Sequence, residues 1–418
     1  MAPISRPGRG RGSLNAVLVV VVSGFFLLLL GAVAACPSGY GDPVAIGYTG
    51  GGGWVEEESG IAASRLNPGV LWLHNDNYDS KFVYAVSTRT GHVVSVLDLE
   101  GLPGVNQYSD FEDLALAPCP FQASIAEDRK EHCIWVGEVG NNAEWGKGAF
   151  VYVIPEPLLG EIHDEMGPVT PRRPEQAVTF RLDFEHYEYF KSPNVEAMAV
   201  AGDGSRFWLF RKTTSHDGDG PAEIWESPSL LEGESFPRDA CEVDSNSTWI
   251  CSLSDREFEW TMTSHPHGAA ELGPWRKPSL SIRSSPGDQS AKVGTVIPLR
   301  LSSLGKMTNP ELEGVPKESQ KDRRNIAAAD LSLDGKRLLL GTYGGIFEYD
   351  LGSPYDMASV LGSRAKQLTR VNRDGSSMLS IGGGDFWAGQ EGVCYDASGG
   401  GIWSVSEHHK KLYFLPCL

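Results

Sequence analysis

The sequence lacks the short motifs that would indicate a catalytic site. It contains no Gly-x-Ser-x-Gly elbow, so a serine nucleophile of the α/β-hydrolase type is not indicated. The glycine run at 50–53 is followed by neither Lys-Ser nor Lys-Thr, which excludes a phosphate-binding loop. No Cys-x-x-Cys pair or Cys/His cluster with zinc spacing occurs, so a structural zinc site is not expected.

Helical periodicity is scarce as well. Few segments place apolar residues every 3.6 positions. Short runs rich in Val, Ile, Leu, Trp, Phe and Tyr alternate instead with turn residues, and the chain contains 49 Gly and 26 Pro. Short apolar runs separated by turn residues are typical of an all-β protein.

Basic residues are outnumbered. The chain has 36 Lys and Arg against 54 Asp and Glu, and the first 35 residues hold three of the bases (Arg6, Arg9 and Arg11) and none of the acids. The remainder therefore carries 33 − 54 = −21. That charge repels nucleic acid and anionic lipid, so no nucleic-acid partner is expected. It fits either a solubilising surface or a face that binds cations.

Residues 1–35 are predicted to be a targeting segment. The three arginines precede an apolar run over 16–35, and Ala32-Val33-Ala34 has the small-x-small form of a signal-peptidase site. The run is also long enough to span a bilayer as an uncleaved anchor, since about 20 apolar residues suffice. A third reading is lipidation at Cys36, which follows Val33-Ala34-Ala35. All three predict a secreted protein or one on the extracellular or luminal face of a membrane.

The chain has seven cysteines, and outside the cytosol thiols tend to pair. Their spacing predicts three disulfides, Cys119–Cys133, Cys241–Cys251 and Cys394–Cys417, with Cys36 left over. Asn246 begins the glycosylation sequon Asn-Ser-Thr in a segment that reads as a surface loop.

One strand pattern recurs five times. Each copy has an alternating strand, a turn, an aromatic-rich strand that ends in polar residues, and a third strand with an aromatic. The copies lie at 59–86, 112–154, 196–225, 328–349 and 391–414. Such repetition predicts a single β-propeller over 56–418, with five blades favoured and six as the alternative.

Two regions of the predicted propeller need separate mention. The segment 36–55 is expected to supply a strand, near 43–48, that closes the ring by completing the last blade. Residues 214–300 fall between the third and fourth copies, and they hold either loop insertions or the extra blade.

Neighbouring strands of a blade run antiparallel, so the start of the first strand and the end of the second meet on one face near the axis. This predicts a shared polar site. Three glutamates at strand starts are candidate calcium ligands, because calcium takes six to eight oxygen ligands: Glu112, Glu196 and Glu391. The candidate ligand-binding residues are Asn75, Asp76, Asn141, Arg211, Lys212, Tyr343 and Glu407.

Other readings of these acids stay open. Carboxylates that converge on a narrow channel raise one another's pKa, and a cation or the bases Arg211 and Lys212 would relieve this. The glutamates would alternatively accept backbone hydrogen bonds and lock the blades together.

Several motifs, in their order, resemble a group of secreted bacterial propeller-like proteins. They are Ser59-Gly60-Ile61-Ala62-Ala63, His74-Asn75-Asp76, Glu112-Asp113-Leu114-Ala115, Gly137-Glu138-Val139-Gly140-Asn141-Asn142 and Asn194-Val195-Glu196-Ala197. The resemblance implies fold and export but no reaction. A looser likeness, in architecture and in the acids at strand starts, is to phytase-like, gluconolactonase-like and calcium-activated apyrase propellers. It implies a divalent ion at the axis.

Two functions follow as hypotheses. The first is a binding module whose channel mouth recognises a small molecule, a glycan or a protein. The second is a metal-dependent hydrolase of phosphoesters, nucleotides or lactones. No catalytic residue is assigned from the sequence.

Overall fold

The computed structural model describes residues 36, 38–50, 53–76, 81–106, 109–120, 131–141, 148–160, 169–187, 192–212, 221–230, 241–243, 249–253, 256–259, 295–313, 320, 323–369, 390–406 and 410–418. Backbone contacts divide the chain into Met1–Ala34 and Ala35–Leu418, and the described residues belong to the second unit. The predicted targeting segment therefore lies outside them. No helix among the described residues is long and apolar enough to cross a bilayer.

Most of the described strands form five four-stranded units. The first contains β2 (Glu58–Ala63), β3 (Val70–Asn75), β4 (Phe82–Ser87) and β5 (Val93–Asp98). The second contains β6 (Phe111–Pro118), β7 (His132–Glu138), β8 (Ala149–Pro155) and β9 (Val178–Phe184). The third contains β10 (Val195–Val200), β11 (Phe207–Arg211), β12 (Ala222–Glu226) and β16 (Thr295–Met307).

The last two units complete the set. The fourth contains β17 (Ile326–Leu331), β18 (Arg337–Thr342), β19 (Gly345–Asp350) and β20 (Lys366–Gln367), and a 3₁₀ helix, η3 (Met357–Gly362), lies between β19 and β20. The fifth contains β21 (Gln390–Tyr395), β22 (Gly401–Ser406), β23 (Lys411–Pro416) and, from the other end of the chain, β1 (Val44–Tyr48).

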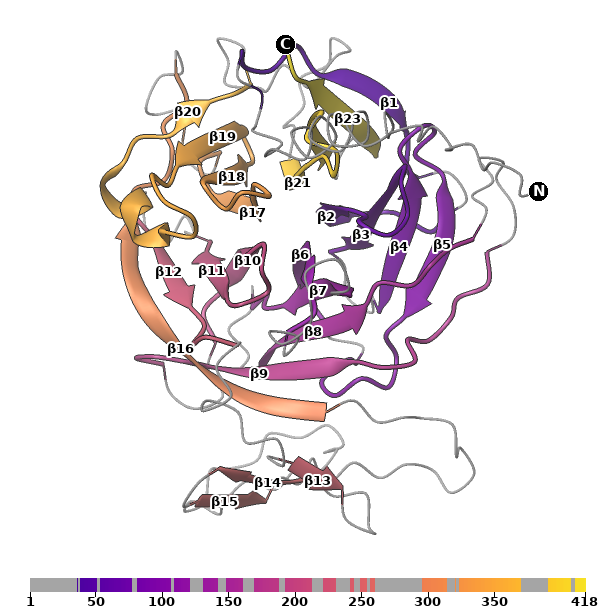
Figure 1. Cartoon of the computed structure of the whole chain (residues 1–418), viewed down its shortest axis with the longest axis vertical. Coiled ribbons are helices and arrows are strands. Elements are labelled where there is room, and N and C mark those ends of the chain that lie inside the picture. Colours follow the sequence, from indigo (N-terminus) through magenta and orange to yellow (C-terminus); the bar gives the residue numbers. More distant parts are fainter. Residues whose placement is uncertain are drawn as a thin grey trace, which may run out of the picture. The chain divides into compact units, whose positions relative to one another are not determined.

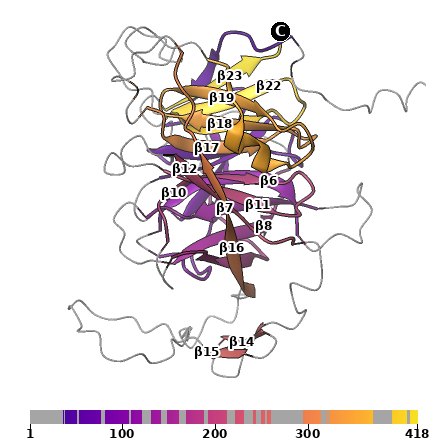
Figure 2. The same cartoon turned by 90° about the vertical axis from the view of Figure 1, so that its left-hand side faces the viewer.

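The units close into a ring. The innermost strands contact one another in the cycle β2, β6, β10, β17, β21 and back to β2. Figure 1 shows these strands nearest the centre, and the view in Figure 2 shows β17, β18 and β19 side by side in one unit. The chain is a β-propeller, as its strand pattern predicts.

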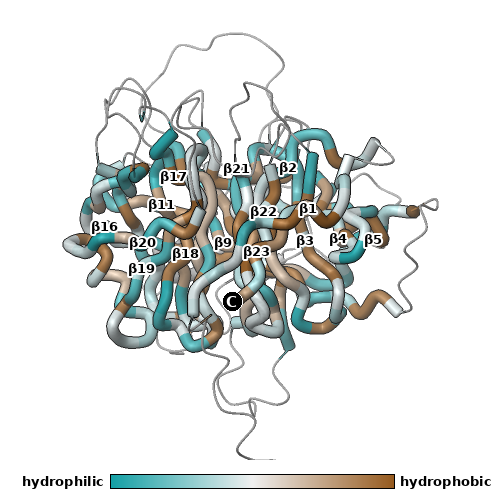
Figure 3. The backbone as a smooth tube through the Cα atoms, turned by 90° about the horizontal axis from the view of Figure 1, so that it is seen from above, coloured by the Kyte–Doolittle hydropathy of each residue, from teal (hydrophilic) through white to brown (hydrophobic). Residues whose placement is uncertain are grey.

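The core consists of apolar layers between neighbouring units. Trp72 packs with Phe111 and Tyr152 where the first and second units meet, and Trp135 with Phe207 where the second and third meet. Corresponding clusters fill the other three junctions. Figure 3 shows the resulting alternation of hydrophobic and hydrophilic stretches along the strands. Burying each large aromatic side chain stabilises the fold by about 2–3 kcal/mol, so the strand pattern and the ring support each other.

Outer edges of the sheets are covered by pairing. β1 pairs antiparallel with β23, with Val44 opposite Phe414, which confirms the predicted closing strand. β9 and β16 pair in parallel and join the second and third units. A bridge between Leu97 and Arg172 covers part of β5. Paired edges leave fewer free backbone groups for association with other chains.

The region 214–300 contains one further sheet among its described residues. It is built from β13 (Cys241–Val243), β14 (Trp249–Leu253) and β15 (Arg256–Glu259), and it shares no backbone pairing with the five units in the described part. The register places Cys241 opposite Cys251. The predicted bond between their side chains, and the sequon at Asn246, lie outside what the structure describes.

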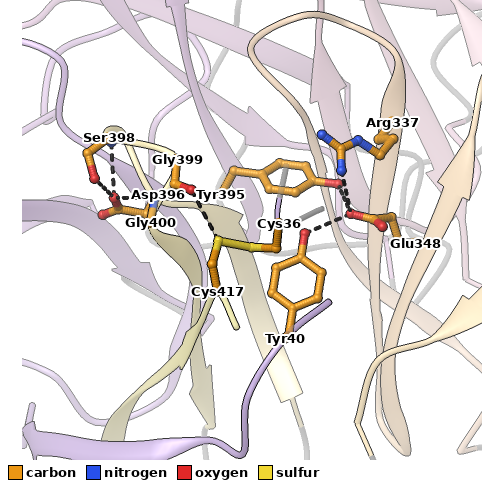
Figure 4. The surroundings of a disulfide bond; sticks show 10 residues. All are labelled: Cys36, Tyr40, Arg337, Glu348, Tyr395, Asp396, Ser398, Gly399, Gly400 and Cys417. Atoms are coloured by element: carbon orange, nitrogen blue, oxygen red, sulfur yellow. Dashed lines mark hydrogen bonds and ion pairs between the residues drawn. A yellow bond between two sulfur atoms is a disulfide. The ribbon is translucent and has the colours of Figure 1, made fainter. Parts of the chain in front are cut away.

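Of the other two predicted disulfides, one is confirmed and one is wrong. Cys119 and Cys133 are bonded. Cys417 is bonded to Cys36 (Figure 4). Cys394 is a buried free thiol. Cys394 lies on β21 and is separated from β23 by β22, which sets them about 10 Å apart, too far for a disulfide.

The Cys36–Cys417 bond also overturns the reading of Cys36 as a lipidated residue, because its sulfur is already used. The backbone of Tyr40 forms an antiparallel β-bridge with that of Cys417. The Tyr40 hydroxyl donates a hydrogen bond to Glu348 Oε1 at 2.8 Å (Figure 4). The start of the described chain is thus fastened to the fourth and fifth units. Two disulfides are typical of proteins from an oxidising compartment.

Candidate functional site

Each inner strand carries a β-bulge at the same place. In all five units the register between the first and second strands shifts by one residue near the start of the inner strand. The residues left without a register partner are Gly60, Glu112, Glu196, Ala327 and Glu391. The three glutamates predicted as metal ligands are therefore structurally equivalent positions of three units. Bulges redirect side chains, and they are common beside active sites.

The ends of the second strands lie opposite these bulges, as predicted. Val195 pairs with Arg211, and Ile326 pairs with Thr342. Asp76, Lys212 and Tyr343 directly follow such strand ends, so they belong to the same mouth of the ring. Glu407, in the equivalent place of the fifth unit, lies outside the described residues.

Three carboxylates gather at this mouth. Oxygen atoms of Asp76, Asp110 and Glu112 all lie within 4.8 Å of one another. Glu112 is 1% exposed and Asp110 is 6% exposed, while Asp76 is half-buried. Within the described part of the chain, Oε1 of Glu112 is buried and has no hydrogen-bond partner. Burial, and then the nearby charges of Asp76 and other acids, raise the pKa of Glu112 well above its ordinary value.

Glu196 has a different environment from Glu112. Lys212 Nζ donates to Glu196 Oε1 at 2.8 Å, and Asn194 Nδ2 donates to the same oxygen at 3.2 Å. The Lys212 ammonium also lies 5.3 Å from the centre of the Tyr343 ring, a cation–π distance. Burial alone would lower the pKa of Lys212, but the charge of Glu196 raises it above its ordinary value. Glu196 is thus already paired with an internal cation.

Glu391 belongs to the same electrostatic neighbourhood. Glu391 is buried. The pKa of Tyr343 is raised well above its ordinary value, first by burial of the tyrosine, then by the charge of Glu196 and then by the charge of Glu391. Among the described residues, however, the group of ligand atoms close enough for one ion includes neither Glu391 nor Glu196. The structure brings the predicted Glu112 together with Asp76 and Asp110 instead.

Two predicted ligand-binding residues use their amides to hold the channel mouth. Asn75 Nδ2 donates to the carbonyl of Trp54 at 3.1 Å, and its Oδ1 accepts the backbone amide of Glu56 at 3.2 Å. Asn141 Nδ2 donates to the carbonyl of Ser192 at 2.7 Å. Arg211, at the end of β11, is half-buried.

Asp110 is not among the site residues that the sequence predicts. It precedes β6 by one residue and matches no position of the repeat. A signal was present, since Asp110 and Glu112 are two residues apart and side chains at that spacing share one face of a strand. Gly140 leaves room for the pair, because a Cβ there would lie 2.0 Å from Glu112 Oε1.

Two aspartates connect the inner strands. Asp113 Oδ2 accepts the backbone amides of Met198 at 2.7 Å and Ala329 at 3.0 Å, so one carboxylate joins β6, β10 and β17. Asp330 accepts the amide of Tyr395 at 2.8 Å and links β17 to β21. A locking role of the kind expected for the channel glutamates is thus filled by Asp113, one residue after the bulge at Glu112, and by Asp330, three residues after the bulge at Ala327.

No family model matches the chain, and no curated protein matches it. Solved structures with a similar chain path include a gluconolactonase from Xanthomonas campestris, at 10% identity and a TM-score of 0.33, with 90% of this chain and 89% of that one covered. Another is the hydrazine synthase of Kuenenia stuttgartiensis, at 10% identity and a TM-score of 0.33, with 86% and 83% covered.

Proposed function

We propose that the channel mouth binds one hard divalent cation through Asp76, Asp110 and Glu112. The observation that carries this is the buried Oε1 of Glu112, which has no hydrogen-bond partner among the described residues and belongs to a carboxylate grouped with those of Asp76 and Asp110. Burying an unpaired carboxylate oxygen is costly, and a cation would offset that cost. A site built only from oxygen donors suits calcium, magnesium or manganese rather than zinc or copper.

The cation in turn would anchor a ligand. Three protein oxygens leave at least three coordination positions for water or ligand atoms on an ion that takes six to eight. Asp76 is half-buried, so part of this ligand is exposed to solvent. The function we favour is an exported or membrane-tethered propeller that recognises an oxygen-bearing small molecule, glycan or protein group through calcium. The two disulfides and the acidic charge support export and argue against nucleic acid as a partner.

Hydrolysis is the second candidate, favoured by the Lys212 ammonium beside the carboxylates. A divalent ion with open positions lowers the pKa of a bound water, and Lys212 would orient the oxyanion of a phosphoester, nucleotide or lactone. Hydrolysis by the wild-type protein with added calcium, lost in Glu112→Gln, would select this function over binding alone.

The test is a calorimetric titration of chelator-treated protein with calcium, magnesium and manganese. We expect one equivalent to bind. The near-isosteric Glu112→Gln should weaken binding at least tenfold, because it removes one charged ligand, while the exposed Glu313→Gln should bind as the wild type does. A wild-type protein that binds no ion, or an unchanged Glu112→Gln, overturns the proposal.

A further inference from the structure

Two of the three equivalent bulge glutamates, Glu112 and Glu196, differ in how their charge is balanced. Glu112 has a buried oxygen without a hydrogen-bond partner among the described residues, and its carboxylate is grouped with those of Asp76 and Asp110. Glu196 accepts a hydrogen bond from Lys212, and its side chain is 1% exposed against 19% for Lys212. Of these two equivalent positions in adjacent units, Glu112 therefore has no paired base in the described contacts, whereas Glu196 has a cation supplied by the chain itself.

We infer that the Lys212 ammonium takes the place of a second divalent ion and so limits the site to one. This inference rests on the proposed function and concerns the number and position of the ions. Lys212 acts as a specificity-determining residue because it withholds Glu196 from coordination. The ion is thereby confined to the side of the mouth where Asp76 and Asp110 lie.

The charges of the cluster support this role. Asp76, Asp110 and Glu196 all act on Glu112, and Lys212 is the base that opposes them. One divalent ion together with Lys212 leaves this group of four carboxylates with a single negative charge. Two ions would neutralise it fully once Lys212 was gone, so the cluster has the charge for a second ion.

Lys212 is held firmly in that position. Its hydrogen bond to Glu196 is 2.8 Å long, and the face of Tyr343 lies on another side of the ammonium. A tethered ammonium does not dissociate into solvent as a bound ion does. An ammonium donates hydrogen bonds but does not coordinate oxygen lone pairs as a metal ion does. Lys212 therefore fills the place of an ion without adding coordination positions for water or substrate.

The experiment compares calcium stoichiometry in the wild type and in Lys212→Met, an uncharged side chain of similar length. We expect the wild type to bind one calcium and Lys212→Met to bind two. Manganese gives a second readout, because two neighbouring Mn²⁺ ions in Lys212→Met should broaden each other's electron paramagnetic resonance signal. Lys81→Met is the matched control, since Lys81 pairs with exposed Glu100 on the outer part of the first unit, and it should bind one ion.

Removal of Lys212 leaves Glu196 buried without its counter-ion, so a double variant keeps the test decisive. Lys212→Met with Glu196→Gln removes both charges, and it should return to one ion. In chelator, Lys212→Met should melt below the wild type and should gain more from calcium. One ion in both the wild type and Lys212→Met overturns the inference alone, whereas no ion in the wild type overturns the proposed function.

Discussion

Asp113 Oδ2 accepts the backbone amide of Met198 at 2.7 Å, although 85 residues separate the two along the chain. The same oxygen accepts the amide of Ala329 from the fourth unit. A single buried carboxylate therefore satisfies amides of two other inner strands at the centre of the ring. Such bonds fix the relative positions of the inner strands of the second, third and fourth units near the axis of the ring.

Replacing this carboxylate should destabilise the whole ring. The two oxygens of Asp113 together accept three backbone amides, and Asp113→Asn replaces one of these oxygens by an NH₂ group, which cannot accept. We therefore expect a loss of about 2–4 kcal/mol in the free energy of unfolding. Urea denaturation measures the loss. Asp350→Asn is the control, because Asp350 is exposed and accepts only the nearby amide of Gly352 in the described contacts. Equal stability of the two variants would contradict the role assigned to Asp113.

The disulfide pattern makes a second prediction. Peptide mapping without reduction should recover a fragment in which Cys36 is joined to Cys417, and Cys394 should react with an alkylating reagent only after unfolding. Burial raises the pKa of the Cys394 thiol well above its ordinary value, which lowers its reactivity further. Cys36→Ser should cost about 2–5 kcal/mol of stability. A peptide joining Cys394 to Cys417 would refute the pairing.

Glu156 should be a second stabilising acid, at the opposite end of the strands from the acidic mouth. It accepts the backbone amides of Arg65 and Leu66 at 3.2 and 3.1 Å and the indole of Trp72 at 3.0 Å. Glu156→Gln replaces one accepting oxygen by a donor, so we expect a loss of about 1–3 kcal/mol in a thermal or urea melt. Glu175→Gln, on an exposed position of the same chain segment, should change little. Calcium binding should be retained in both variants, which separates this role from that of Glu112.

Asp330 gives a pH prediction. Burial raises its pKa to about 6 from the ordinary 3.8, even though the amide of Tyr395 and the charge of Arg65 oppose the rise. The folded protein therefore binds this proton more tightly than the unfolded chain does. Stability should fall as the pH rises from about 4 to about 6, by up to about 2 kcal/mol from this group.

Asp330→Asn cannot ionise, and it isolates that contribution. The difference in unfolding free energy between Asp330→Asn and the wild type should shift in favour of the variant between pH 4 and pH 7. Urea melts at both pH values measure the shift, and Asp350→Asn corrects for general effects of removing an acid. Parallel pH dependence of Asp330→Asn and the wild type would show that the proton on Asp330 does not contribute.

Much of the fold could be predicted because it depends on local pattern. Apolar strands such as 70–75 and 411–416 can keep their side chains from water only by packing against neighbouring sheets, and most of their residues are buried. Repetition of that pattern supplies the neighbours and hence the ring. Proximity in sequence likewise suffices for Cys119 and Cys133, which lie 14 residues apart.

The composition of the site depended on the tertiary structure. A bulge at each inner strand places Glu112 and Glu196 in equivalent positions, but only the packed neighbours decide that Lys212 pairs with one and that Asp76 and Asp110 face the other. The same holds for Cys36 and Cys417, which are 381 residues apart and meet because β1 completes the sheet of β23. The order of apolar and polar residues along a strand indicates which side chains are buried, and this can be read from a short stretch of sequence. Charge pairing and disulfide formation depend instead on distances between residues far apart in the sequence, which are set only once the ring has closed.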